Sequence, residues 1–190
     1  MPDSKLSETG SGVNLLYRTS TYLVGHMQYA SGQDWREYVE KELQPLNLRI
    51  FNPYKKPFLK DVEEDETARE KMLRQMERGE YDKVANRMRE IRNFDLNLVD
   101  RADFIIAHIV PHIASWGSAE EIDTAVRMKK PIFLSIEGGK KKTPLWTLAQ
   151  IPHEYIYNNV QEIVGTIKEI DAGTREIDSV RWRLLNKNLR

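Results

Sequence analysis

The sequence predicts an α/β fold in which a parallel sheet of about five strands has helices on both of its faces. Two patterns lead to this expectation. First, β-prone runs alternate along the chain with stretches of helical spacing, as in successive strand–helix–strand units. Second, the run DFIIAHIV at 103–110 is almost entirely apolar, as expected for a strand that is buried on both faces. The 190 residues, 40% hydrophobic and 31% charged, suit one domain with a sizeable core.

Five β-prone runs are expected to form the strands. The first, TYLVG, ends at Gly25, and the second, LRIFNP, is stopped by Asn52 and Pro53, a pair typical of turns. The other three runs are DFIIAHIV, PIFLSI and EYIY. The expected strands therefore span residues 21–25, 48–53, 103–110, 131–136 and 154–157.

Stretches of helical spacing separate these runs. In GQDWREYVEKEL, for example, Trp35, Val39 and Leu43 fall on one face of a helix. The last segment, REIDSVRWRLLNKNLR, has the pattern of a basic amphipathic helix. We expect this helix, with Trp182, Leu184 and Leu185 among its basic residues, to contact another subunit. Helices are expected at 32–43, from 81 to about 100, from 117 to 129, at 159–171 and at 175–190.

The chain is expected to form one domain with two less regular segments. Residues 1–17 are polar and rich in Gly and Ser, which predicts a flexible lead-in to a single α/β domain at 18–190. Within that domain, residues 60–80 are highly charged and are broken by Gly79. They predict a helical insertion that is either a solvated helix or a lid.

Composition and charge exclude several classes of protein. The formal net charge is zero, which gives no global electrostatic case for binding nucleic acid or an anionic membrane. The absence of cysteine excludes disulfides, thiolate metal ligands and a cysteine nucleophile. No apolar run approaches the ~20 residues that span a bilayer, and we expect a cytoplasmic protein. The basic run GGKKKTP at 138–144 fits a solvated loop better than a patch that steers phosphate.

In a parallel sheet covered on both faces, ligands bind beyond the carboxyl ends of the strands, where the strand order reverses. The residues just after the expected strands are therefore candidate ligand contacts. They are Gly25, His26, Asn52, the segment 108–112 and the turn into the helix at Gly117. His108 and His112 lack the one-face helical spacing of a zinc pair, so no metal site is expected, and His108 fits a core histidine.

A carboxylate interrupts the apolar stripe of the helix expected at 81–100. Val84, Met88, Ile91 and Leu98 form this stripe, and Asp95 is the position that completes it. A carboxylate on a buried face is costly unless it is paired or used. Asp95 is therefore either a structural cap of neighbouring backbone or a site carboxylate at the ligand edge of the sheet.

Two adjacent glutamates stand near the start of the helix expected at 117–129. Both are expected in its first turn, where the helix N-terminus favours negative charge. That effect is a sufficient explanation for Glu120. Glu121 instead lies beside the packing face that Ile122 and Ala125 form, near the strand-end cleft.

The two unusual carboxylates, Asp95 and Glu121, suggest acid–base or nucleophilic chemistry on a glycosidic type of bond. The turn before Glu121, ASWGSA, has a glycine and two hydroxyl groups, and such a turn can present backbone N–H groups to a phosphate. Neither a Walker-type lysine loop nor a G-x-G-x-x-G motif occurs, so ATP hydrolysis and dinucleotide binding have little support.

Three blocks of the sequence resemble the nucleoside 2-deoxyribosyltransferases and the related hydrolases that cleave deoxynucleoside 5′-monophosphates. The first block is YLVG at 22–25, the second is DLNLVDRADFIIA at 95–107, and the third is SWGSAEEIDTAVRMKKPI at 115–132. In the third, a glycine stands four residues before the family's nucleophilic glutamate, and the helix ends at Lys-Pro. That register selects Glu121 rather than Glu120.

The resemblance, over roughly residues 20–136, implies a doubly wound fold of the flavodoxin or Rossmann type and a double displacement without a cofactor. Glu121 would attack the anomeric carbon, Asp95 would hydrogen-bond the base or a sugar hydroxyl, and Tyr22 would hold the Glu121 carboxylate. The expected substrate contacts are Gly25, His26, Asn52, Ser115, Trp116 and Gly117.

Ser115 bears on the substrate. Transferases that take free nucleosides often have aspartate at this position, whereas the 5′-monophosphate hydrolases resemble this chain in having serine there. Because an aspartate would repel a phosphate, Ser115 favours a nucleoside 5′-monophosphate. The acceptor of the sugar is either a second base or water. Transfer to a base needs a site shielded from water, and Trp116 and Tyr29 are either that shield or packing residues.

Two other functions are compatible with the same pocket: a nucleotide-binding sensor without chemistry, and a glycohydrolase that acts on NAD. The expected partners are a small-molecule nucleoside or nucleotide and further copies of the chain, because family members often complete the 5′ site from a neighbouring subunit. A homo-oligomer is therefore expected.

Overall fold

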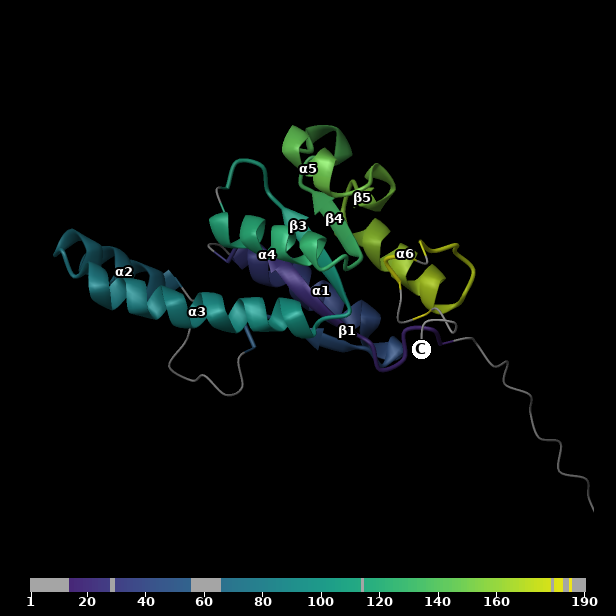
Figure 1. Ribbon diagram of the computed structural model, residues 1–190, viewed down its shortest axis with the longest axis horizontal. Helices are drawn as coiled ribbons and strands as arrows, with labels where there is room; N and C mark the ends of the chain where they lie inside the picture. Colours follow the sequence, from purple (N-terminus) through teal and green to yellow (C-terminus); the bar gives the residue numbers. More distant parts are fainter. Residues whose placement is uncertain are drawn as a thin grey trace, which may run out of the picture.

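The computed structural model describes residues 14–27, 30–55, 66–113, 115–178, 180–182 and 185. A five-stranded parallel sheet has the strand order β2-β1-β3-β4-β5, so the order reverses between β1 and β3 (Figure 1). This is the doubly wound, flavodoxin-like order, and it confirms the predicted fold class. The strands are β1 (Ser20–Gly25), β2 (Arg49–Phe51), β3 (Phe104–Ile109), β4 (Ile132–Ile136) and β5 (Ile156–Tyr157).

Helices cover both faces of the sheet and create two separate cores. On one face, α1 and α6 pack on the sheet, and Val39 and Ile163 belong to the same buried cluster as Phe104. On the other face, α3 and α4 pack, and Leu98 and Ile122 are buried there. The helices are α1 (Ala30–Leu43), α2 (Glu66–Glu77), α3 (Tyr81–Arg101), α4 (Trp116–Arg127), α5 (Leu145–Gln150) and α6 (Val160–Asp171).

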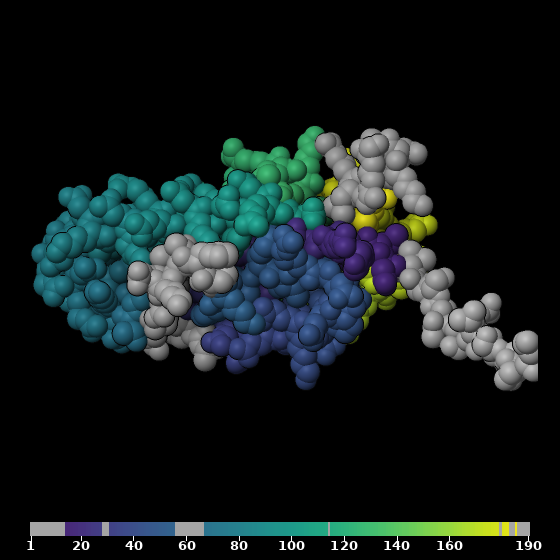
Figure 2. Space-filling model, turned by 90° about the horizontal axis from the view of Figure 1, so that it is seen from below, coloured from purple at the N-terminus to yellow at the C-terminus, as the bar shows by residue number. Residues whose placement is uncertain are grey.

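The charged segment predicted at 60–80 contains α2, which packs against α3 as a helical hairpin. Gly79, with φ +74°, makes the turn between the two helices in a conformation that residues with a Cβ rarely adopt. The hairpin extends beyond the sheet and forms one end of the molecule (Figures 1 and 2). Residues 56–65, where the insertion was expected to begin, lie outside the described residues.

The N-terminal boundary differs from the expected one. Residues 1–13 lie outside the described residues, but Leu16 is fully buried in the core of the α1 and α6 face. The Leu16 backbone N–H also donates to the Asp171 carboxylate at 2.9 Å, at the end of α6. The packed part of the chain therefore includes Leu16, which the sequence had assigned to the lead-in at 1–17.

The helix predicted at 175–190 is wrong for the part of the segment that the structure describes: residues 175–178 and 180–182 form no α-helix. Trp182 is 0% exposed and lies against the rings of Phe104 and Phe133, with ring centroids 5.4 and 5.7 Å away. A side chain that fills the core of its own chain is not a subunit contact. The pattern was misread because tryptophan among basic residues suits an amphipathic helix as well as an anchored coil.

The short helix α5 was not predicted. Its six residues are too few to show a period, and Leu145 and Trp146 point into solvent rather than into the core. The basic run before it forms a short 3-10 turn at Lys140–Lys142, with Lys141 and Lys142 exposed, as expected for a solvated loop. Within the described residues, no helix is long and apolar enough to cross a membrane.

Candidate active site

A hydrogen bond joins two residues that are 99 positions apart in the sequence. The Tyr22 hydroxyl, on β1, donates to Oε1 of Glu121, on α4, at 2.7 Å. Tyr22 is 1% exposed and Glu121 is 9% exposed, so the carboxylate is one of the few charged groups in the interior. The hydrogen bond limits the rotamers of Glu121 and fixes where its second oxygen lies.

The position of Glu121 on α4 differs from the expected one. Ser115 caps α4, and its side chain accepts a hydrogen bond from the Ser118 backbone N–H. Because the helix begins at Trp116, Glu120 and Glu121 lie in its second turn, and the first turn has no acidic residue. The helix N-terminus acts mainly on the first turn, so it is not what keeps Glu121 in place. Two other features keep Glu121 in place: its burial on the inner flank of α4 and the hydrogen bond from Tyr22.

The electrostatics of Tyr22 identify the donor. Burial raises the pKa of Tyr22 well above its usual 10, and the nearby charges of Glu121 and Asp95 raise it further. Tyr22 therefore keeps its proton throughout the physiological range, so its hydroxyl is the donor and Glu121 the acceptor. The influence of Asp95 on the same hydroxyl indicates that both carboxylates lie near the Tyr22 side chain.

Both carboxylates line one pocket of about 660 Å³, a volume typical of small-molecule sites. Its walls come from the end of β1, the α2–α3 hairpin and the N-terminal turns of α4. Asp95 is half-buried on α3, which agrees with the interpretation as a site carboxylate at the ligand edge. The lining includes Gly25, Met27, Arg69, Met72, Met88, Arg89, Arg92, Asp95, Ser115, Trp116, Gly117, Ser118, Glu120 and Glu121.

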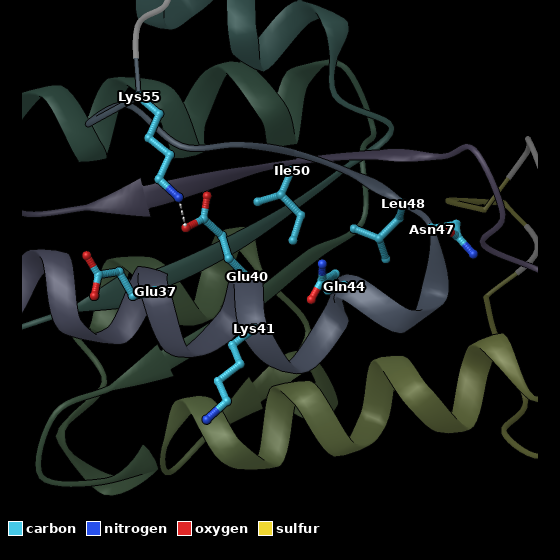
Figure 3. A pocket seen from close by; sticks show the side chains of 8 residues that line it. All are labelled: Glu37, Glu40, Lys41, Gln44, Asn47, Leu48, Ile50 and Lys55. Carbon is cyan, nitrogen blue, oxygen red and sulfur yellow. Dashed lines mark hydrogen bonds and ion pairs between the residues drawn. The ribbon is translucent and has the colours of Figure 1, made fainter.

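A second pocket of about 660 Å³ lies along α1 and β2, at the edge of the sheet (Figure 3). Glu40 and Lys55 form an ion pair across it at 2.7 Å. None of the candidate site residues lines this groove. The pocket of Glu121 is therefore the candidate active site.

The two glutamates on α4 have different environments. Glu120 is partly exposed and pairs with the Arg92 guanidinium of α3. The hydrogen bond from Arg92 lowers the pKa of Glu120. Glu120 therefore ties α4 to α3, while Glu121 points to the end of β1.

Gly25 is required by close packing at the end of β1. A Cβ at this position would lie 2.7 Å from the backbone oxygen of His108, because β1 and β3 pair there. Gly117 has open space around it, so the structure shows no packing reason for a glycine in the first turn of α4. Trp116, its neighbour, is 88% exposed at the mouth of the pocket.

Ser115 lies between the candidate site and a smaller neighbouring pocket of about 440 Å³. Its hydroxyl makes a 2.7 Å hydrogen bond with the Ser118 hydroxyl, besides capping α4. His26 and His108 line the smaller pocket rather than the one that holds Glu121. The structure thus brings Ser115 to the Glu121 pocket and places His26 next to it.

Two of the other expected contacts have structural partners. Asn52 is buried, accepts a hydrogen bond from the Tyr54 backbone N–H at 3.0 Å and does not line the Glu121 pocket. The imidazole of His108 lies 2.8 Å from the Ser135 hydroxyl, and burial lowers its pKa to about 4. His108 is therefore uncharged at neutral pH, in line with its interpretation as a core histidine.

Sequence reasoning missed Arg36, which is fully buried beneath the turn after β1. Its guanidinium donates to four main-chain carbonyls, those of Leu23, Gly25, His26 and Gly32. These bonds hold the segment that carries Gly25 and Met27 to the pocket. A signal was present, since Arg36 is three positions before Val39 and so falls on the buried face of the predicted helix.

Sequence reasoning also missed the pocket wall that the hairpin supplies. Met72 and Arg69 come from α2, and Met88 and Arg89 come from α3. In so charged a segment, only the packing of α2 on α3 shows which side chains turn towards the site. Among the described residues, no group of three or more histidine, aspartate or glutamate side chains could hold a metal ion.

A buried carboxylate held by a hydrogen bond at the switch point of a doubly wound sheet, with a second carboxylate in the same pocket, defines a class. This is the class of α/β proteins whose pocket at the strand ends suits carboxylate acid–base or nucleophilic chemistry. The chain belongs to the family described as nucleoside 2-deoxyribosyltransferase YtoQ, whose sequence pattern matches residues 22–173. The family resemblance noted in the sequence is thereby confirmed.

A solved structure of a transferase shares this fold. The 2-deoxyribosyltransferase of Bacillus psychrosaccharolyticus is 16% identical, with a TM-score of 0.52 over 77% of this chain and 90% of that one. The CMP N-glycosidase BcmB of Clostridium botulinum is 15% identical, with a TM-score of 0.47 over 80% of this chain and 99% of that one. At such identity the first likeness concerns the fold alone. None of the curated proteins matches the chain in sequence.

Proposed function

We propose that the chain cleaves the N-glycosidic bond of a nucleoside or deoxynucleoside, preferentially as its 5′-monophosphate, through a covalent glycosyl ester on Glu121. The sugar then passes to a second base or to water. The observation that carries this proposal is the 2.7 Å hydrogen bond from Tyr22 to Glu121 inside a pocket at the switch point of the sheet. Family membership supports the same type of chemistry.

In the first step, a Glu121 oxygen forms a bond to the anomeric carbon while the bond from that carbon to the base nitrogen breaks. The electron pair of the broken bond goes to the base. Asp95 lines the same pocket and is the group that would hydrogen-bond the base or a sugar hydroxyl as this charge develops. In the second step, a base or a water attacks the anomeric carbon, and the ester bond breaks to restore the Glu121 carboxylate. The proton that the attacking group loses goes to the nitrogen of the departed base, which becomes neutral.

Tyr22 would act by position. A nucleophilic carboxylate must be ionised and aimed, and a neutral donor on one oxygen leaves the other free to attack. The raised pKa of Tyr22 supports this role because the donor stays protonated wherever the carboxylate is charged.

Two features bear on the finer choices. Ser115 stands at the pocket with a neutral hydroxyl where a carboxylate would repel a phosphate, which supports a 5′-monophosphate as substrate. Trp116 is largely exposed, so within one chain it does not shield the site from water. That exposure supports water as the acceptor when a single chain forms the site.

The test is to incubate the chain with single deoxynucleosides and their 5′-monophosphates, with and without a second free base, and to separate the products by chromatography. Release of base without an acceptor indicates hydrolysis, and a new nucleoside indicates transfer. Glu121→Ala should abolish turnover. Glu120→Ala is the matched control, because it removes the neighbouring carboxylate from the same helix turn.

Mass spectrometry of the intact chain, quenched during turnover, should show an adduct of the sugar's mass on the wild type. If wild type turns over no nucleoside or nucleotide, or if Glu121→Ala keeps its activity, the proposal is refuted.

A further inference from the structure

Two arginines on the outer wall of the Glu121 pocket have no carboxylate partner within the described part of the chain. Arg69 lies on α2 and Arg89 on α3, and both line the pocket. Most other arginines of the hairpin are paired: Arg74 with Glu70, Arg87 with Glu90 and Arg78 with Glu80. Arg89 instead donates a hydrogen bond to a neutral group, the amide oxygen of Asn86, at 2.6 Å. Positive charge is therefore left over on this wall.

A third arginine of the pocket, Arg92, shows where Arg89 lies relative to the first turn of α4. Arg92 pairs with Glu120 and so fixes the register between α3 and α4. Both helices run antiparallel to the strands, and hence parallel to each other (Figure 1). One turn before Arg92 comes Arg89, and one turn before Glu120 come Trp116 and Gly117. Arg89 is therefore level with the first residues of α4.

The pocket is thus polarised along its length. Its inner end, beside Tyr22 and the end of β1, holds the carboxylates of Asp95 and Glu121. Its outer end, at the hairpin, holds the guanidinium groups of Arg69 and Arg89. A ligand that fits both ends has a polar uncharged part for the inner end and an anion for the outer end.

We infer that Arg69 and Arg89 form a pair that binds the phosphate of a nucleoside 5′-monophosphate. The inference rests on the proposed function and adds to it the residues that select the phosphate. Guanidinium groups suit this task because their planar N–H groups bind phosphate oxygens in pairs and stay charged at all working pH values. The sugar then lies between the pair and Glu121, with its anomeric carbon at the inner end.

The decisive experiment compares initial rates for a deoxynucleoside 5′-monophosphate and for the same deoxynucleoside without phosphate. In the double variant Arg69→Ala/Arg89→Ala, the ratio of the two kcat/KM values should fall at least about tenfold, mainly through KM for the monophosphate. Arg69→Lys and Arg89→Lys should recover part of that loss, since lysine keeps the charge. Arg74→Ala on α2 and Arg87→Ala on α3 are matched controls that remove an arginine from the same helices outside the pocket.

Binding of inorganic phosphate provides a second measurement that needs no turnover. Millimolar phosphate should raise the Tm of the wild type and of both control variants, and should raise that of the double variant much less. The effect should weaken as sodium chloride is added, because the contact is electrostatic.

Three outcomes overturn the inference. One is an equal loss of kcat/KM for both substrates in the double variant, which indicates a general effect on the hairpin. Another is the same stabilisation by phosphate with and without the two arginines. The third is a wild type that cleaves nucleosides but not their monophosphates. In that case the proposed cleavage of N-glycosidic bonds is supported, and the role of Arg69 and Arg89 in binding phosphate is refuted. If wild type cleaves neither, the proposed function fails, and the phosphate titration alone decides the pair.

Discussion

The inner and outer ends of the candidate pocket are built from different materials. The inner end consists of buried residues on the sheet and on α4, joined by a hydrogen bond of defined length. The outer end consists of long, exposed side chains on the α2–α3 hairpin, several of them methionine or arginine. A bond-forming group must be held within fractions of an ångström, whereas a wall that selects substrates can be built from adaptable side chains. On the proposed function, the inner end carries out the chemistry and the outer end selects the substrate.

The largest effect is expected at the inner end. Glu121→Gln keeps the size of the side chain and removes the charge, so it should lower kcat by about 10³-fold or more. Initial-rate measurements on wild type, Glu121→Gln and Glu120→Gln test this. A loss of similar size in Glu120→Gln would contradict the assignment of Glu121, and not Glu120, as the nucleophile.

Acid should lower the stability of the wild type through His108, which lies on β3 and lines the smaller neighbouring pocket. The pKa of His108 in the folded chain is about 4, lowered from 6.5 by burial, so the unfolded chain binds the proton first as the pH falls. The folded state therefore loses stability between about pH 6.5 and 4, by up to about 3 kcal/mol. Urea unfolding of wild type and His108→Gln at pH 7 and pH 4.5 measures how much unfolding free energy each protein loses between the two pH values. The variant should show a smaller pH dependence, and equal dependence in both would contradict this assignment.

Tyr22→Phe removes the donor to Glu121 while keeping the ring in place. It should lower kcat by roughly 10- to 100-fold and change KM little, because the bond aims a nucleophile rather than binding substrate. The expected split between kcat and KM is the measurement. A change in KM alone would indicate that Tyr22 contributes to substrate binding rather than to the reaction step.

The smallest effect is expected at the outer wall. Met88→Ala trims an exposed side chain that lines the pocket, so it should raise KM a few-fold and leave kcat near its wild-type value. The same assay should be run with substrates that carry different bases. If the outer wall selects the substrate, Met88→Ala should change the order of their kcat/KM values. A fall in kcat that is equal for every base would instead tie the hairpin to the chemistry.

The same division explains what the sequence could predict. The continuously apolar run of β3 carries a strong periodic signal and correctly predicts a buried strand. The interrupted stripe on α3 singles out Asp95, which lines the pocket, but its role as a site carboxylate stays a prediction. The partnership of Tyr22 with Glu121 came from family resemblance, because no local pattern links residues 99 positions apart. Arg69 and Arg89 stayed hidden in a segment where charged residues occupy every face. Trp182 misled because its core partners, Phe104 and Phe133, are far away in the sequence.

The buried guanidinium of Arg36 has a consequence for how this protein can change over generations. It binds main-chain oxygens at residues 23, 25, 26 and 32, and such atoms are present whatever side chains those positions carry. The path of the turn after β1 is thus largely independent of the side chains that face outward from it. Gly25 and Gly32 are exceptions, because a Cβ at Gly25 would lie 2.7 Å from the backbone oxygen of His108 and a Cβ at Gly32 would lie 2.5 Å from that of His26. Met27 lines the pocket from this turn, so new substrate preferences could arise there without rebuilding the reactive end.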